Sequence, residues 1–361
     1  IGGGYIQDEG LIRGMLDAGV KYFDTAESYP GHHRLIARAI KGYDRKSFFL
    51  TSKMEAKGDI SRESFIRRAR KCLEELETEY LDCMMMHMPE KLETLKTEGF
   101  HQAMKELKAE GRIRFVGVSH HGSFWFLAPE VTMEKTLLAA AEDGRFDVFL
   151  MAYNFLQMDQ GERVLEVCKE KKIGVALMKT KPVNNYYNLK SRVENLEKEG
   201  KEIHPVYQEG LKRFKEQADK AEYFVEKYNL KNPEEIREAA VKFVLSNPNI
   251  NTVCCSAQNY DELERYVRLS GTRLSALEKE KLAAYRKGCG LLYCRHACGL
   301  CEPQCPHHVP VNTIMRYNHY FEAQGREKEA MDKYAAIPGA KADLCQSCPG
   351  YCETACPYNV P

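Results

Sequence analysis

Four side chains that can carry out acid–base chemistry, Asp24, Tyr29, Lys53 and His87, fall at or just after the ends of apolar runs typical of buried strands. In a parallel barrel the pocket opens at the C-terminal ends of the strands, so charged groups at those ends are expected to meet. A phenol is a poor acid near neutral pH, but an adjacent ammonium group stabilises the phenolate. These residues therefore predict acid–base chemistry on a carbonyl group. Taken singly, each could instead be an ordinary polar residue at a strand end.

The elements that would position these residues alternate between strand and helix up to about residue 287. Seven strand-like runs occur, at residues 21–23, 48–51, 81–86, 114–119, 146–153, 173–178 and 250–255. An eighth is expected at Ile1-Gly2-Gly3-Gly4, which resembles the end of a strand that begins upstream. Alternation with this count favours a (β/α)8 TIM barrel over an open sheet. We therefore predict a barrel domain at residues 1–287.

The connection from residue 180 to residue 233 is longer than an ordinary barrel connection. It begins with the polar and aromatic run Asn184-Asn185-Tyr186-Tyr187, which predicts a loop, and residues 207–228 predict one long surface helix. Either a lid over the pocket or a decorative insertion would fit this pattern. A second loop, at residues 121–129, carries Phe124, Trp125 and Phe126 and is expected to form part of the pocket wall.

Composition excludes several classes of function. The 361 residues carry a formal net charge of +1, so nothing favours binding to nucleic acid or to an anionic membrane. No apolar run approaches the roughly 18 residues that a membrane span needs. No signal peptide is visible, which predicts a cytoplasmic protein, or an exported one if a signal lies upstream.

The cysteines point to a second module, because nine of the fourteen fall after residue 288. Eight of them form two near-copies of one pattern, Cys294-x3-Cys298-x2-Cys301-x3-Cys305-Pro306 and Cys345-x2-Cys348-x3-Cys352-x3-Cys356-Pro357. Closely spaced thiolates that end in Cys-Pro are typical of ferredoxin-type [4Fe–4S] sites. We therefore predict a small, mostly helical, ferredoxin-like iron–sulfur domain at residues 288–361, with two clusters.

The assignment of cysteines to clusters follows the rule for two-cluster ferredoxins, in which the fourth cysteine of each run serves the other cluster. One cluster would take Cys294, Cys298, Cys301 and Cys356, and the other Cys345, Cys348, Cys352 and Cys305. Cys289 is a spare thiol that could substitute. Structural zinc and disulfides are the alternatives. Eight cysteines with two Cys-Pro endings favour iron–sulfur clusters over both.

The segments FDTAESY, LTSK and YLDCMMMH resemble the aldo-keto reductase family. The resemblance implies that Asp24 pairs with Lys53, that Lys53 acidifies Tyr29, that Tyr29 protonates the carbonyl oxygen, and that His87 orients it. The C-terminal part resembles the helical ferredoxin domain appended to a subset of this family in anaerobic prokaryotes. Together the two resemblances cover nearly the whole chain.

The resemblance also implies a nicotinamide site, where the match is weaker. Ser119 and His120 stand where a Ser and an Asn contact the carboxamide, and Ser256 stands at a phosphate contact. Leu150 and Met178 replace a usual Gln and a usual stacking aromatic residue. The cations that would grip a 2′-phosphate are not at their expected positions, which predicts weak NADPH binding.

The two modules together suggest how electrons would move. Clusters transfer electrons singly, whereas a hydride carries two, so a flavin or a substrate that tolerates radical steps would have to connect them. We expect an oxidoreductase that reduces, or reversibly oxidises, a small carbonyl or alcohol substrate, with electrons passed through the clusters from a ferredoxin-like partner. NAD(P) and a flavin are both candidate cofactors. The alternatives are an NAD(P)H-dependent reductase with structural clusters, and a redox-sensing or docking subunit.

Overall fold

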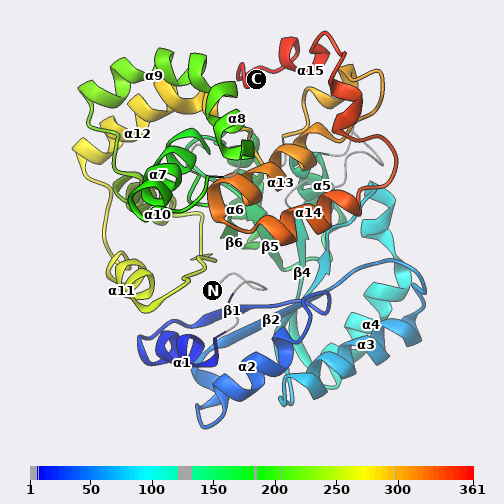
Figure 1. The fold of residues 1–361 in the computed structure, drawn as a ribbon. Helices are drawn as coiled ribbons and strands as arrows, with labels where there is room; N and C mark the ends of the chain where they lie inside the picture. Colours follow the sequence, from blue (N-terminus) through cyan, green and yellow to red (C-terminus); the bar gives the residue numbers. More distant parts are fainter. Residues whose placement is uncertain (1–5, 7, 121–131, 183–184, 204, 297) are drawn as a thin grey trace.

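A sheet of seven parallel strands, paired in the order of the sequence, forms the centre of the molecule in a computed structural model (Figure 1). The structure describes residues 6, 8–120, 132–182, 185–203, 205–296 and 298–361. The strands are β1 (Tyr22–Asp24), β2 (Phe49–Met54), β3 (Leu81–His87), β4 (Ile113–His120), β5 (Val148–Ala152), β6 (Gly174–Met178) and β7 (Thr252–Val253). All seven predicted strands are confirmed, and they curve into a nearly closed α/β barrel. The expected eighth strand, at residues 1–4, lies outside the described residues.

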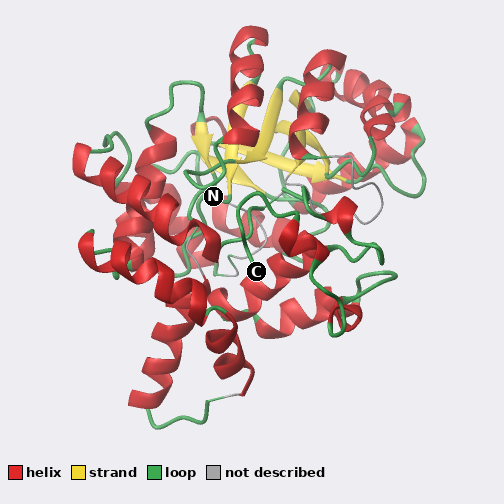
Figure 2. Ribbon diagram, turned by 90° about the horizontal axis from the view of Figure 1, so that it is seen from above, coloured by secondary structure: helices red, strands yellow, loops and turns green. Residues whose placement is uncertain are grey.

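Helices surround this sheet, as Figure 2 shows from above. Those of the barrel part are α1 (Glu9–Asp17), α2 (His32–Ile40), α3 (Arg62–Glu75), α4 (Glu98–Ala109), α5 (Met133–Asp143), α6 (Asp159–Lys171), α10 (Pro233–Leu245), α11 (Tyr260–Arg268) and α12 (Ala276–Cys289). Short 3-10 helices lie at η1 (Arg45–Ser47) and η2 (Leu92–Lys96). Side-chain caps fix several starts: Asp8 accepts from the Leu11 amide, and Ser275 forms a capping box with Glu278.

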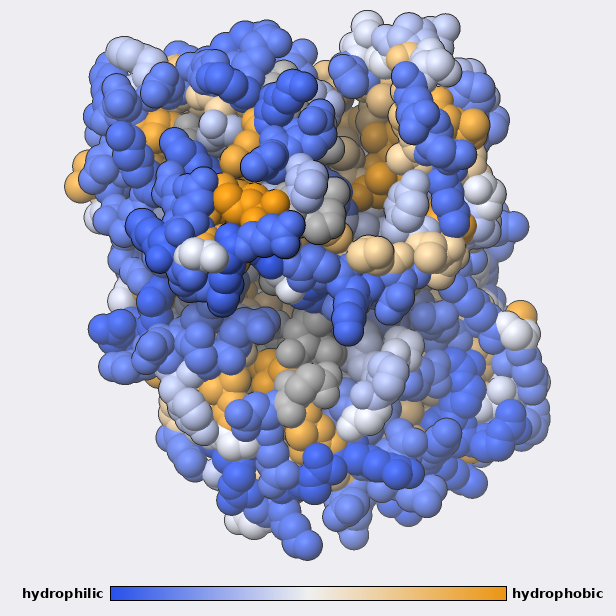
Figure 3. Space-filling view, in the orientation of Figure 1, coloured by the Kyte–Doolittle hydropathy of each residue, from blue (hydrophilic) through white to orange (hydrophobic). Residues whose placement is uncertain are grey.

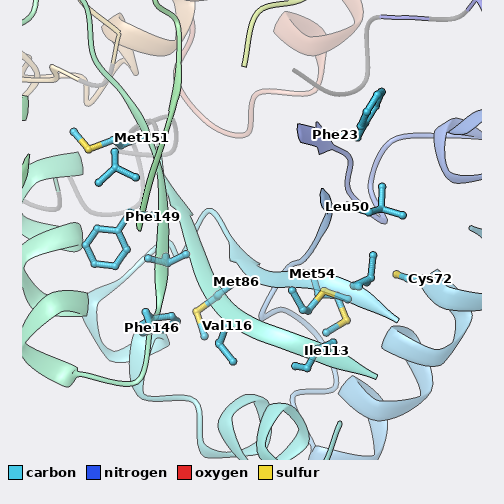
Figure 4. Close-up of a cluster of buried hydrophobic side chains, with 14 of the residues drawn as sticks. Phe23, Leu50, Met54, Cys72, Met86, Ile113, Val116, Phe146, Phe149 and Met151 are labelled. Carbon is cyan, nitrogen blue, oxygen red and sulfur yellow. The ribbon is translucent and has the colours of Figure 1, made fainter. Parts of the chain in front are cut away.

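The alternation of side chains along each strand separates two apolar layers. Leu50, Met86, Val116 and Phe149 pack with the surrounding helices in the main core, part of which Figure 4 shows. The next residues along the strands face the barrel interior, where Cys83, Met85, Leu150, Ala176 and Cys254 form a separate cluster. Because side chains alternate between faces, Asp24, Lys53, His87 and Ser119 belong to the interior set. The barrel therefore directs all four toward one end of its interior.

The long connection after β6 differs from its prediction. It contains three helices, α7 (Asn185–Lys198), α8 (Pro205–Arg213) and α9 (Lys215–Lys227), so the expected loop at Asn185 is helical. The single helix predicted at residues 207–228 is wrong, because the chain breaks at Phe214, which is 1% exposed. Phe214, Ala221 and Val225 belong to a second core with Phe155 and other residues. The segment is thus an integral layer of the molecule and not a surface decoration.

The C-terminal segment is mostly helical, as predicted, and lies against the barrel. It contains η3 (Gly290–Leu292), η4 (Glu302–Gln304), α13 (Val311–Gln324), α14 (Glu327–Ala335), η5 (Ala342–Cys345) and α15 (Tyr351–Thr354). Leu292 and Tyr293 are buried with Phe155 and Leu156, which follow β5. Lys179, directly after β6, donates to the Tyr320 hydroxyl at 3.0 Å. Figure 3 shows a hollow with apolar colouring in the upper part of this face, where Figure 1 places the C-terminal segment.

Candidate active site and cysteine module

The centre of the candidate site is a buried ion pair between neighbouring strands. Lys53 lies near the end of β2, and its Nζ is 2.7 Å from Oδ2 of Asp24, the last residue of β1. The two side chains are only 1% and 5% exposed. The same Nζ donates to the backbone oxygen of Thr25 at 2.5 Å. Burying two charges is expensive unless they meet closely, so this pair holds the ammonium group in one position.

Tyr29 lies against this ammonium group. The Lys53 Nζ is 5.0 Å from the centre of the Tyr29 ring, and the His87 ring meets the same phenol edge-on, with centroids 6.0 Å apart. The structure therefore brings together all four residues predicted for acid–base chemistry. Burial, followed by the charges of Lys53 and Lys57, holds the pKa of His87 well below its usual range. His87 is thus a neutral imidazole at neutral pH, able to orient a carbonyl oxygen.

Several polar atoms at this end of the barrel are buried and have no hydrogen-bond partner among the described residues. They are Oδ1 of Asp24, Nδ1 of His87 and Oγ of Ser119. His87 and Ser119 are register partners on β3 and β4. Because unpaired buried polar atoms are unfavourable, they indicate a place where a ligand supplies the missing partners.

The nucleotide positions predicted from the sequence divide into two groups. Ser119 faces the barrel interior, whereas His120 lies on the opposite face of β4. Burial lowers the pKa of His120 to about 4, and a hydrogen bond with the Pro89 backbone opposes this shift. Near Ser256, the sequence reasoning missed a cation: Lys181 donates to the Ser256 carbonyl at 3.2 Å and to the Tyr266 hydroxyl at 2.7 Å. Lys181 follows β6 and is distant from Ser256 in the sequence, so only the fold reveals this proximity.

The predicted wall loop at residues 121–129 lies outside the described residues, as does Asn184. The pocket walls that it would supply therefore stay predictions.

Charge repulsion among the cysteines of the C-terminal segment contributes to raising the pKa of several of their thiols. Burial raises the pKa of Cys294, and repulsion from Cys298, Cys301 and Cys356 raises it further. Burial likewise raises the pKa of Cys345, with added repulsion from Cys305 and Cys348. The pKa of Cys352 is raised by burial, by Glu353, and by Cys345 and Cys305. Charge repulsion therefore acts between the two runs, and it also couples Cys301 to Cys352, which the predicted assignment places in different clusters.

The two Cys-Pro sequences adopt the same local geometry. The amide of Val309 donates to Sγ of Cys305 at 3.4 Å, and the amide of Val360 donates to Sγ of Cys356 at 3.5 Å. The residue before each valine has a positive φ, 53° at His308 and 52° at Asn359. Hydrogen bonds to cysteine sulfur are among the means by which proteins tune iron–sulfur clusters. The repeat seen in the sequence is therefore also a structural repeat.

Arg295, between Cys294 and Cys298, is a buried cation that sequence reasoning did not single out. It is 5% exposed, and within the described residues no carboxylate pairs with it. Its N–H groups instead donate to the carbonyls of Leu156, Gly290 and Tyr293, and the guanidinium stacks 3.9 Å over the Tyr358 ring. A buried charge is costly unless it is paired or hydrogen-bonded. Burial lowers the pKa of Arg295, and the nearby side chains of Tyr358, Tyr293, Cys294 and Cys298 oppose this shift.

The described thiols do not form a site for a single metal ion. No group of three or more His, Cys, Asp or Glu side chains in the described part of the chain lies close enough to hold one. Structural zinc requires four ligands in a compact tetrahedron. The same finding gives no support to the predicted iron–sulfur sites, which therefore stay predictions.

A parallel β/α barrel with an acid–base group at the C-terminal ends of its strands is the architecture of a barrel enzyme. The sequence profile of the Aldo/keto reductase family matches residues 7–286 of this chain. The chain therefore belongs to the aldo/keto reductase family, a family of oxidoreductases.

Individual relatives agree with this family. Aldo-keto reductase YhdN of Bacillus subtilis (strain 168) is 22% identical over 287 residues, which cover 75% of this chain and 81% of that protein. "Methylglyoxal reductase DkgB" of Escherichia coli O157:H7 is 29% identical over 133 residues, covering 37% of this chain. The match spans about half, 47%, of that reductase's own length.

Solved structures show the same fold. The holo form of an aldo-keto reductase from Bacillus halodurans aligns with a TM-score of 0.53 at 20% identity, covering 78% of this chain and 88% of that one. An aldo/keto reductase from Klebsiella pneumoniae in complex with NADP and acetate aligns with a TM-score of 0.53 at 19% identity, covering 78% of this chain and 85% of that one.

Within the described residues, no helix is both long and apolar enough to cross a membrane.

Proposed function

We propose that this protein reduces a small carbonyl compound, or oxidises the corresponding alcohol, with Tyr29 as the proton donor. The buried pair of Lys53 and Asp24 beside the phenol carries this proposal, because it fixes a positive charge where a phenolate would form. His87 is neutral and has a free Nδ1 within the buried site. It orients the carbonyl oxygen toward the Tyr29 hydroxyl.

A nicotinamide cofactor fits the same end of the barrel. NAD(P)H, when bound, supplies a hydride to the carbonyl carbon. The unpartnered Oγ of Ser119 would accept or donate a hydrogen bond to its carboxamide. Lys181, held at Ser256, would provide a positive charge for its phosphates. Lys181 offers a single cation, so we expect modest affinity for a 2′-phosphate.

The experiment for the catalytic part compares Tyr29→Phe with the unaltered protein in NADPH- and NADH-dependent reduction of a carbonyl panel. Methylglyoxal is a reasonable first substrate, because the name of one relative states that activity. Loss of one proton donor should lower kcat by about a hundredfold or more while the fold is retained. Full activity of Tyr29→Phe would refute the proposed role.

We further propose that the eight cysteines hold two [4Fe–4S] clusters. The observation that supports this is the buried Arg295 guanidinium, which has the Cys294 and Cys298 thiols near it and forms no ion pair with a carboxylate among the described residues. Clusters, when bound, transfer electrons one at a time. Cys294, Cys298, Cys301 and Cys356 would hold the cluster that Arg295 contacts, while the amides of Val309 and Val360 hydrogen-bond to ligand sulfurs.

Anaerobic purification followed by iron and acid-labile sulfide analysis tests the clusters. We expect iron and sulfide equivalent to two four-iron clusters, with zinc absent. Adding NADPH then separates two roles. Bleaching of the cluster absorbance would require a flavin or an equivalent carrier between nucleotide and clusters, whereas unchanged absorbance with carbonyl reduction would favour structural clusters.

A further inference from the structure

A cleft of about 620 Å³ opens between α12 and the Cys-Pro turn that follows Cys356. Its walls include Phe155 and Phe243 from the barrel part, and Pro357, Tyr358 and Asn359 from the C-terminal turn. The cleft thus lies at the boundary between the barrel and the cysteine module. It is separate from the acid–base site, since none of Asp24, Tyr29, Lys53 or His87 lines it.

The cleft is positively charged. Lys279, Arg286, Lys287 and Arg295 line it, and none of its described lining residues is a carboxylate. The first three are exposed and project from α12, where residues 279, 283, 286 and 290 all line the cleft at a helical spacing. Arg286 lies 3.2 Å from Asp159, whereas in the described part of the chain no carboxylate pairs with Lys279. This surface therefore presents an excess of positive charge to solvent.

The floor of the cleft touches the first cysteine group. Tyr358 is two residues beyond Cys356, and Arg295, which stacks on it, lies between Cys294 and Cys298. A partner seated in this cleft would contact residues directly attached to cluster ligands. We propose that the cleft docks an acidic one-electron carrier protein, which delivers electrons to the cluster held by Cys294, Cys298, Cys301 and Cys356. This inference rests on the proposed function of these cysteines.

The form of the charge favours a protein over a small anion. Among the described lining residues Arg295 is the only buried cation, and it already donates to three backbone carbonyls. The remaining cations are long, exposed side chains on one helix, which do not converge on a single phosphate-sized point. Spread positive charge of this kind steers an oppositely charged protein and fixes its orientation. Electron-carrier encounters use small interfaces of this type.

The electron balance is simple. Each reduced carrier loses one electron to the cluster, which is reduced by one. The acidic carrier is the reductant in each step.

The test uses a purified ferredoxin of strongly negative net charge as the probe. Its binding to the full chain is measured by calorimetry at low and high salt, and its reduction of the clusters by stopped-flow absorbance. The variant is Lys279→Glu with Lys287→Glu, and the control is Lys105→Glu on α4, an exposed lysine that does not line the cleft. We expect binding and cluster reduction to weaken about tenfold or more in the double variant, with a shallower salt dependence. Lys105→Glu should match the unaltered protein.

Three outcomes separate this inference from the function on which it rests. If iron and sulfide are present and dithionite reduces the clusters of the double variant normally, loss of ferredoxin binding supports docking at the cleft. If the clusters are present but the double variant binds as the unaltered protein does, the cleft is not the docking site. If the protein contains no iron and sulfide, both the cluster proposal and this inference fail.

Discussion

Replacing Lys53 by Met removes one half of the buried ion pair and should reduce stability and activity by separable amounts. The Asp24 carboxylate is 5% exposed, and Lys53→Met removes the partner of its Oδ2. Its Oδ1 already has no partner among the described residues. Breaking a buried pair in this way costs about 3–5 kcal/mol. The double variant Asp24→Asn with Lys53→Met removes both charges and should recover most of that loss. Activity should not recover, since neither variant has an ammonium group beside Tyr29, and kcat should fall about a hundredfold or more.

The assay pairs urea unfolding, followed by circular dichroism, with steady-state reduction of the best carbonyl substrate. Lys215→Met is a matched control, because its pair with Asp219 is 66% and 56% exposed and solvent screening leaves it little effect on stability. The reasoning would be refuted by a Lys53→Met variant as stable as the control. It would equally be refuted by a double variant that regained normal kcat.

Three further predictions follow from buried groups elsewhere. Burial lowers the pKa of His32 and His120 to about 4, whereas an unfolded histidine titrates near 6.5. The unfolded chain therefore binds more protons than the folded chain as pH falls below about 6.5, so the urea midpoint should drop between about pH 7 and about pH 5. The drop should be smaller in His120→Gln, and a rise in the midpoint would contradict this prediction. Arg295→Met removes a cation next to the proposed cluster and should make its reduction potential more negative in an EPR-monitored titration, while an unchanged potential would exclude the contact. Gly117→Ala would place a Cβ 2.7 Å from Cγ of Met85 inside the barrel, and it should lower the free energy of unfolding in urea by about 1–3 kcal/mol. An unchanged free energy of unfolding would show that the interior can adjust.

The barrel was predictable because its signals are local. Each strand is a short apolar run, and the alternation of side chains fixes which residues face the interior. This is why Asp24, Lys53 and His87 could be expected at strand ends and together. The pairing of the two cysteine runs follows from the rule for two-cluster ferredoxins and stays a prediction.

What could not be predicted depends on contacts between distant segments. Lys181 gains its place near Ser256 only through the fold, and Arg295 is recognisable as a buried cation only once Leu156 and Tyr358 are placed around it. The burial of α9 had a sequence signal that was missed. Phe214, Ala218, Ala221 and Val225 recur at helical spacing on one face, which indicates burial and not a surface helix.

The cysteine segment is joined to the barrel by contacts directly after β5 and β6. Gln157 donates to the carbonyl of His296, and Lys179 donates to the Tyr320 hydroxyl at 3.0 Å. These contacts join the two parts within one chain. In the proposed electron path, transfer from the cysteines to the barrel is therefore a unimolecular step whose rate does not depend on protein concentration. Only the encounter with the carrier is bimolecular, so dilution would slow the arrival of electrons and leave their use within the chain unaffected.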